Sequence, residues 1–394
     1  MHPPRLKSID VFRALTMFLM VFVNDLWSLK DVPDWLEHMP PGKDGLGFSD
    51  IIFPAFLFIV GLSTPHAITN RVERGESKAA ILYYIVIRSM ALLVMGFFHV
   101  NLESYSDAAL LPKPLWQILI TIGFFLIWLD YPREKRKLQV ILRSLGIILL
   151  ITMAALYVGA SSQGEEIWMR TSWWGILGLI GWAYFFSSVV FVIAGRKIIV
   201  LTGILLLIIT LNAVLHLNWS GMPSSLKTFL NAVGFIDTTN ISLVMGGIVT
   251  SVVYYRFSDR LKELSLILLI SSILLIAYAF ATRPIWGIAK LGGTPSWMAL
   301  CFGISLITFL LLIMLVDKNG KENWFRLIKA AGTSTLTCYL LPYIHYALLN
   351  VFPNLRLPES VRTGGIGIVK SLLYALIIIL ITETISRYRI RLKV

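Results

Sequence analysis

Apolar segments of about 17–25 residues recur along the chain between short polar stretches, and a helix of that length crosses a bilayer core. We count twelve, centred near residues 19, 58, 89, 122, 149, 184, 207, 246, 273, 306, 339 and 375. The fourth has a short apolar core, and the eighth contains Gly246 and Gly247. The pattern therefore predicts an all-α, polytopic membrane protein with about 10–12 transmembrane helices.

Composition supports this class, because 57% of the residues are hydrophobic and only 14% are charged, with a mean hydropathy of +0.76. No long polar stretch is left for a soluble domain, so residues 1–394 are expected to form a single transmembrane domain. No small-x-small cleavage site follows the first apolar segment, which we therefore interpret as a retained span and not a signal peptide.

The net charge of +13 is explained by membrane topology. If the N-terminus is cytoplasmic and the spans alternate, most lysines and arginines fall in cytoplasmic segments, as the positive-inside rule requires. The sequence then predicts that both termini are cytoplasmic and that the basic inner face meets anionic membrane lipid. No nucleic-acid partner is needed.

Familiar catalytic and metal-binding motifs are absent. Cys301 and Cys338 lie inside predicted spans, and there is no CxxC, HExxH, Walker A or GxSxG pattern. We expect neither a disulfide framework nor a metal.

Ionisable residues in the hairpin of about residues 8–68 are the strongest sign of chemistry, since such groups are costly inside a membrane. Asp10 and Arg13 are three residues apart, so they share a helix face and can pair. Arg13 either closes a structural ion pair or meets an anionic ligand that enters from the cytoplasm. Arg88, in the third span, either joins it or extends toward the inner interface.

Four further residues surround the loop of this hairpin. Asn24 lies about 17 Å beyond Arg13 on the same helix, where it can solvate the interface or steady an oxyanion. For its neighbour Asp25 we expect solvation. His38, in a short loop with two prolines, can relay a proton near neutral pH. Asp50, after Ser49 as a helix cap, either complements the helix dipole, orients His38 or accepts a proton from a substrate amine.

Other polar and aromatic residues near the outer side are weaker candidates for acceptor binding. His99 could line the entrance for an acceptor, and His345 falls in the outer half of its span. Both can equally be polar groups bonded within the bundle, as can His66. Trp286 is either a membrane anchor or a ring that stacks on a sugar.

The string SIDVFRALTMFLMVFVND, a loop histidine and then FSDIIFPAFLFIVG resemble the heparan-α-glucosaminide N-acetyltransferase family. The family's asparagine, histidine and acidic residue match Asn24, His38 and Asp50. The resemblance implies acetyl transfer from cytoplasmic acetyl-CoA, as co-substrate, to the amine of an amino sugar or glycan on the far side. It implies oxyanion stabilisation by Asn24, base or nucleophile chemistry by His38, and orientation by Asp50, with Asp10, Arg13 and Arg88 on the acetyl-CoA side.

The resemblance also leads us to expect a compact bacterial relative in the inner membrane, without the luminal N-terminal region of the lysosomal enzymes, and it is compatible with a homodimer. Two alternatives stay open. Asp10-x-x-Arg13 also resembles the membrane acyltransferases that O-acetylate surface polysaccharides, although these usually have a histidine where Asn24 stands. A twelve-span transporter of small molecules would suit the same composition.

Overall fold

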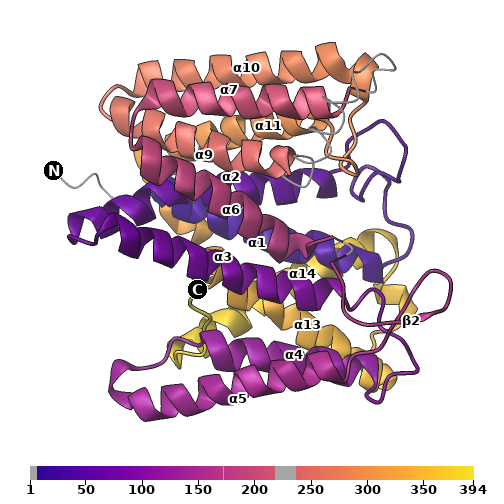
Figure 1. Ribbon diagram of the computed structural model, residues 1–394. Coiled ribbons are helices and arrows are strands. Elements are labelled where there is room, and N and C mark those ends of the chain that lie inside the picture. The colour runs from indigo at the N-terminus through magenta and orange to yellow at the C-terminus, as the bar shows by residue number, and fades with distance from the viewer. Residues whose placement is uncertain (1–6, 172, 218–236) are drawn as a thin grey trace, which may run out of the picture. The chain divides into compact units, whose positions relative to one another are not determined.

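The computed structural model describes residues 7–171, 173–217 and 237–394, and within them it is built almost entirely of helices (Figure 1). The long helices are α1 (Lys7–Asp25), α2 (Ser49–Glu73), α3 (Lys78–Val100), α4 (Lys113–Trp128), α5 (Arg136–Ala155), α6 (Gly175–Ala194), α7 (Ile198–Leu215), α9 (Thr238–Phe257), α10 (Leu261–Trp286), α11 (Pro295–Leu312), α13 (Thr335–Val351) and α14 (Gly364–Arg387). The described residues also form a short α12 (Lys329–Thr333), two strands, β1 (Gly159–Ala160) and β2 (Glu166–Ile167), and several short 3-10 or π-helical segments.

The predicted all-α membrane fold is confirmed. Each of the twelve predicted centres falls inside one of the twelve long helices. Among the described residues, eight helices are long and apolar enough to cross a membrane: α2, α3, α5, α6, α7, α10, α14, and α11 with its π-helical continuation to Lys318. Of the other four, α4 and α13 are shorter, and α1 and α9 are less apolar or more charged.

The chain divides into two compact units, and the division passes through α1, α3 and α6. The first unit holds residues 1–16, 33–89 and 182–324, and the second holds residues 17–32, 90–181 and 325–394. Each is described by itself, and the single domain expected from the sequence stays a prediction.

In the first unit, α10 packs on α11, and α9 packs on both α2 and α7 (Figure 1). Glycines allow α2 and α9 to approach closely: a Cβ on Gly61 would lie 2.0 Å from the carbonyl oxygen of Val244, and one on Gly247 would lie 2.0 Å from that of Phe58. Small residues serve the same purpose in other membrane bundles. The glycines that weakened the prediction of the eighth span are therefore what lets α9 be buried along nearly its whole length.

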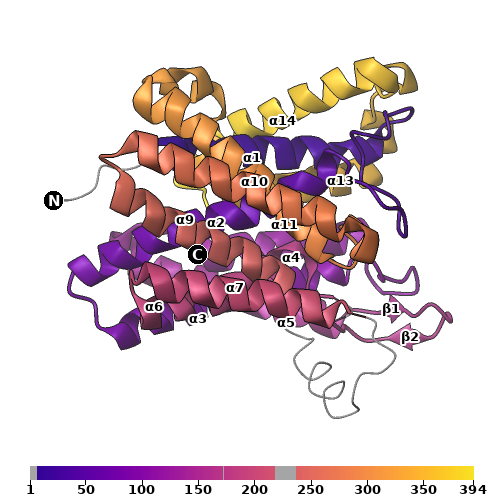
Figure 2. The same ribbon diagram turned by 90° about the horizontal axis from the view of Figure 1, so that it is seen from above.

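In the second unit, α4 packs on α5 and α13, and α13 packs on α14. The indole N–H of Trp116, which is fully buried, donates to the carbonyl of Met153 and ties α4 to α5. The antiparallel strands β1 and β2 form a small hairpin between α5 and α6 (Figure 2).

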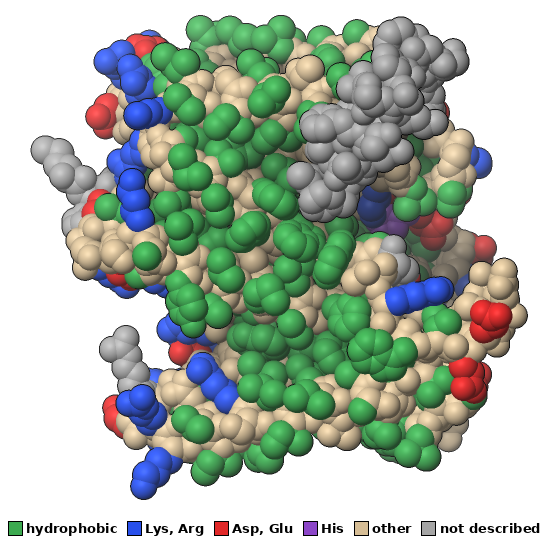
Figure 3. Space-filling view, in the orientation of Figure 1, with side chains coloured by type: hydrophobic (Ala, Val, Ile, Leu, Met, Phe, Trp, Pro, Cys, Tyr) green, Lys and Arg blue, Asp and Glu red, His purple; other side chains and the backbone are tan. Residues whose placement is uncertain are grey.

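The outward faces of the helices are apolar. Isoleucine and leucine side chains on α5, α7 and α10 are more than 40% exposed, as expected for surfaces that meet lipid tails; Ile151, Leu207 and Leu274 are examples. In each unit, hydrophobic side chains cover the length of the helices, and lysines and arginines gather near the helix ends (Figure 3).

Candidate active site at the N-terminal end of helix α2

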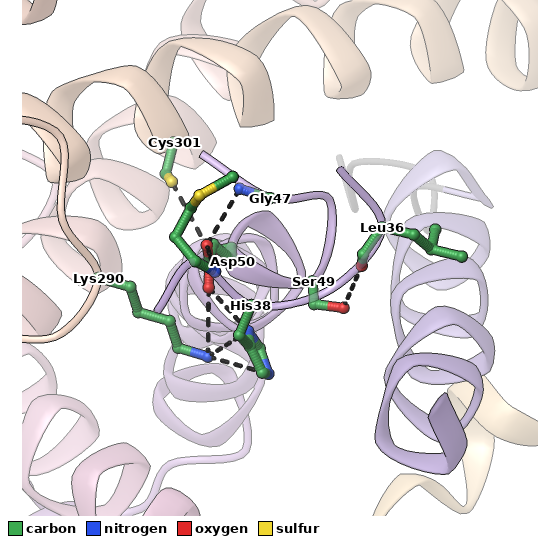
Figure 4. Close-up of polar contacts among 8 residues, drawn as sticks. Leu36, His38, Gly47, Ser49, Asp50, Lys290 and Cys301 are labelled. Atoms are coloured by element: carbon green, nitrogen blue, oxygen red, sulfur yellow. Dashed lines mark hydrogen bonds and ion pairs between the residues drawn. The ribbon is translucent and has the colours of Figure 1, made fainter. Parts of the chain in front are cut away.

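His38 and Asp50 meet at the start of α2 (Figure 4). The Nδ1 atom of His38 lies 2.7 Å from Oδ1 of Asp50. Because a carboxylate only accepts hydrogen bonds, the proton belongs on Nδ1, and Nε2 keeps its lone pair. The Asp50 side chain is 1% exposed, whereas that of His38 is 49% exposed. The arrangement is that of a base or nucleophile that a buried carboxylate orients from behind.

The second carboxylate oxygen of Asp50 holds the loop that carries His38. Oδ2 accepts hydrogen bonds of 3.1 Å from the backbone N–H groups of Met39 and Gly47. Gly47 is required there, because a Cβ would lie 1.8 Å from the carbonyl oxygen of Glu37. Asp50 thus closes residues 39–47 into a loop and points His38 at the same time.

The predicted helix cap at Ser49 is wrong. Ser49 is the first residue of α2 and not its cap, and its hydroxyl donates to the carbonyl of Leu36 at 2.7 Å. The backbone N–H of Phe48 also donates, to the carbonyl of Trp35 at 2.7 Å. These bonds join the start of α2 to the residues just before His38, so both ends of the loop are fixed next to His38.

Lys290, which the sequence analysis did not single out, is the third charged group of this site. Its Nζ atom lies 3.1 Å from Nδ1 and 3.4 Å from Nε2 of His38, and 3.9 Å from Oδ1 of Asp50 (Figure 4). Behind the carboxylate, the buried thiol of Cys301 lies 3.9 Å from the backbone oxygen of Asp50. The charged site therefore consists of His38, Asp50 and Lys290.

A loop between α10 and α11 carries Lys290 and is bound to the His38 loop. Asp44 accepts from Nε of Arg283 at 2.8 Å and from the backbone N–H of Ile288 at 2.7 Å, and the N–H of Gly45 donates to the carbonyl of Ile288. The Ile288 N–H, with Arg283 beside it, holds the pKa of Asp44 below its usual range. This docking places Lys290 against His38, although the two are far apart in sequence.

Burial lowers the pKa of Lys290, and the negative charge of Asp50 opposes the shift. The side chain is 27% exposed. Its ammonium form thus gives up a proton more readily than that of an exposed lysine.

Arg13 and Asp10 pair on α1, with 3.5 Å between Nη1 and Oδ1. Nη2 of Arg13 also donates to the hydroxyl of Ser63 on α2 at 2.6 Å. Further along α2, Thr69 accepts a hydrogen bond of 3.0 Å from Arg196. Basic side chains therefore meet the second half of α2, away from His38.

Arg88 is accompanied by tyrosines. It is the eleventh of 23 residues in α3, where its guanidinium donates to the hydroxyl of Tyr84 at 3.0 Å and lies 4.9 Å from the ring centroid of Tyr184. Arg71 stacks on the other side of this group, 3.5 Å from the ring centroid of Tyr84. Among the described residues, tyrosines and not carboxylates accompany Arg88.

Asn24 and Asp25 belong to the second unit. Asn24 is half-buried one residue before the end of α1. The expected solvation of Asp25 is wrong: its side chain is fully buried, pairs with Lys370 at 2.7 Å, and accepts from the hydroxyls of Ser371 at 2.6 Å and Tyr346. A carboxylate that is fully paired in this way stabilises the packing of α1 with α13 and α14.

The weaker candidates have contacts of their own within each unit. In the second unit, the buried ring of His99 stacks on Tyr343 at 4.0 Å, and Nδ1 of His345 lies 3.1 Å from the hydroxyl of Tyr374. Trp286 ends α10 in the first unit, four residues before Lys290, and its buried indole N–H has no partner among the described residues. No group of three or more potential metal ligands occurs in the described ranges.

Comparison with known proteins places these observations in a family. Residues 5–222, more than half of the chain, match the family described as a domain of unknown function, DUF5009. The chain belongs to the DUF5009 family. It is also 39% identical over 103 residues to heparan-alpha-glucosaminide N-acetyltransferase of Homo sapiens, and 39% identical over 101 residues to the protein of that name from Mus musculus.

The similarity of this DUF5009 member to the two acetyltransferases is partial. Each match covers 25% of the chain and 14% of the relative's length. The predicted resemblance to that acetyltransferase family is confirmed over this part.

Proposed function

We propose that the protein is a transmembrane acetyltransferase. It moves an acetyl group from cytoplasmic acetyl-CoA to the amine of a terminal glucosamine, or of a related amino sugar or glycan, on the extracytoplasmic side. The similarity to two proteins named as N-acetyltransferases of a glucosaminide supports the reaction class. The proposal is carried by one observation, the 2.7 Å contact between His38 and Asp50 at the end of a span.

The chemistry proposed for His38 follows from its hydrogen bond. Because the Nδ1–H group donates its hydrogen bond to Asp50, the ring presents the Nε2 lone pair to a substrate. The buried carboxylate stabilises the positive charge that the ring gains during the reaction. Nε2 can take a proton from the acceptor amine, or attack the thioester carbonyl and carry the acetyl group itself. The oxyanion role of Asn24 stays a proposal from the resemblance, because Asn24 lies in the other unit.

The arginines of the first unit fit the anionic end of acetyl-CoA. Arg88 is held by tyrosines and Arg13 is fixed to Ser63 with Asp10 beside it, so both are positioned cations that an anion could meet. Ser63 follows Asp50 by 13 residues on α2, which is about 20 Å along the helix. Arg13 and Arg88 would hold the nucleotide end, while the thioester supplies the activated acetyl group near His38.

The remaining parts of the proposal concern location and assembly. The positive-inside pattern supports cytoplasmic termini and an extracytoplasmic His38 loop. The bacterial inner membrane, the homodimer, and the binding of the acceptor near His99, Trp286 and His345 are further proposals.

Release of free thiol from acetyl-CoA in the presence of glucosamine tests the proposed function. Purified protein in detergent is compared with His38→Ala and with Glu37→Ala, which changes an exposed neighbour in the same loop. Wild-type and Glu37→Ala protein should release thiol at similar rates, and His38→Ala should be slower by about 10²–10⁴-fold.

Other outcomes separate the alternatives. Equal release by wild type and His38→Ala would keep the enzyme and reject this site. If wild type releases no thiol, and acetyl-CoA does not raise its melting temperature, the transporter hypothesis becomes the better one, because a ligand of the native state must stabilise it. Transfer to hydroxyl groups of a polysaccharide, and not to glucosamine, would favour the O-acetyltransferase alternative.

A further inference from the structure

Lys290 is the charged group of the site to which neither the sequence motif nor the comparisons assign a role. It reaches His38 from the loop between α10 and α11, and its Nζ atom lies within 3.4 Å of both ring nitrogens. Nδ1 already has Asp50 as its partner at 2.7 Å. The amine therefore lies against the ring between its two nitrogens, slightly nearer to Nδ1, and within reach of a group that is bound at Nε2.

We propose that Lys290 is the proton donor and acceptor of this acyl-transfer centre. The inference rests on the proposed acetyltransferase function and adds a catalytic residue to it. The geometry carries it: a partly buried amine lies 3.4 Å from the nitrogen whose lone pair faces the substrates, and a buried carboxylate 3.9 Å away keeps it in place.

In the first half of the reaction, Nε2 of His38 forms a bond to the acetyl carbon, and the bond between that carbon and sulfur breaks. The Lys290 ammonium gives its proton to the departing thiolate and becomes a neutral amine. In the second half, the acceptor amine bonds to the acetyl carbon, the bond to Nε2 breaks, and Lys290 takes the proton that the acceptor nitrogen loses. The sum is one thioester and one amine converted into one thiol and one amide.

If His38 acts only as a base, the same assignment holds for the leaving group. His38 takes the proton of the acceptor amine, and Lys290 supplies the one that the thiolate needs. The imidazolium of His38 then returns its proton to the neutral amine of Lys290, which lies within 3.4 Å of both ring nitrogens, and both groups are restored. Among the residues that the structure describes, three titratable groups face Lys290: His38 and Asp50 from the hairpin, and Cys301 from α11. The Asp44–Arg283 pair holds the two loops together.

The lowered pKa of Lys290 is measurable without acetyl-CoA. Trace labelling with isotopic acetic anhydride over a range of pH, followed by peptide mass spectrometry, reports the neutral fraction of each amine. Lys43, an exposed lysine of the His38 loop, is the internal reference. Lys290 should become reactive at a lower pH than Lys43. In Asp50→Asn it should become reactive at a lower pH still, because the carboxylate that raises its pKa is gone.

Thiol release then tests proton transfer itself. Lys290→Met removes the amine, and Lys290→Arg keeps the positive charge but cannot give up its proton at neutral pH. Both should be slower than wild type by about 10²–10⁴-fold. Added methylamine or ethylamine should restore part of the rate of Lys290→Ala, but not that of His38→Ala. Labelling of His38 by diethyl pyrocarbonate at the wild-type rate shows that the loop is intact in each Lys290 variant.

Several results would overturn the role of Lys290 and leave the acetyltransferase standing. These are a wild-type rate in Lys290→Arg, no rescue of Lys290→Ala by any amine when His38 still labels normally, or labelling of Lys290 at no lower pH than Lys43. A wild-type protein that releases no thiol would overturn the proposed function, and the role of Lys290 with it.

Discussion

Replacement of Asp50 separates its two roles, since one carboxylate oxygen orients His38 and the other holds the loop. In Asp50→Asn, the amide oxygen can still accept from Met39 and Gly47. The amide nitrogen then faces Nδ1 as a donor, so the ring must carry its proton on Nε2, the atom that needs a lone pair. Asp50→Asn therefore keeps the loop in place but holds His38 in the tautomer that has no lone pair on Nε2.

The structure sets the size of both effects. The equivalent change in a Ser-His-Asp triad lowers kcat by about 10⁴, and we expect a loss of about 10²–10⁴ for Asp50→Asn. In Asp50→Asn, the hydrogen bonds from Met39 and Gly47 go to a neutral amide oxygen and not to a charged carboxylate. This change should lower the unfolding free energy by about 1–2 kcal/mol. Asp50→Ala also leaves two backbone N–H groups without an acceptor, one buried and one half-buried, for a total of about 2–4 kcal/mol.

The assay pairs thiol release with thermal unfolding in the same detergent. Asp50→Asn should unfold near the wild-type temperature and be nearly inactive, whereas Asp50→Ala should be inactive and clearly less stable. An Asp50→Asn protein with wild-type kcat would refute the orienting role of Asp50. Equal stability of Asp50→Asn and Asp50→Ala would refute its role in holding the loop.

Three further predictions concern the supports of the site and the second unit. Gly47→Ala should lower the unfolding free energy by about 1–3 kcal/mol or more, because its Cβ meets a backbone carbonyl. In the control Gly45→Ala the Cβ meets only a methionine side chain, and thermal unfolding compares the two variants. Asp25→Ala should cost about 3–5 kcal/mol, and adding Lys370→Met should recover part of that loss, which a double-mutant cycle of melting temperatures measures. The pKa of Asp44 is lowered from 3.8, so its stabilising bonds persist above that pH and are lost as the pH falls below it; melting temperatures from pH 7 to pH 3 should drop more steeply in wild type than in Asp44→Asn.

The sequence predicts the helices well because each span must satisfy its own backbone hydrogen bonds and bury about one bilayer thickness of apolar surface. That requirement is local, so length and hydropathy are enough, and even the two weak spans, at α4 and α9, are present. The pairing of His38 with Asp50 can also be predicted, because the two residues lie twelve positions apart in the sequence and the short loop between them contains two prolines.

Contacts between distant loops cannot be predicted in the same way. Lys290 lies 252 residues from His38, and Lys370 lies 345 residues from Asp25. In the sequence each is a single lysine near or within an apolar segment, and nothing nearby marks its partner. For the same reason the sequence offers two interpretations of Arg88, beside Arg13 or at the inner interface, and only the packing of α3 against Tyr184 shows that aromatic rings accompany its charge.

The depth of the charged groups along α2 favours an enzyme over a carrier. A carrier binds its solute at one site near the middle of the membrane, where the contacts from several helices converge. Here Arg13 touches α2 at Ser63, about 20 Å along the helix from the His38–Asp50 pair. A small solute cannot contact both places, but an acyl donor with a charged end and a long flexible arm can. The separation therefore suits a donor that is anchored by its nucleotide at one depth and reacts at another.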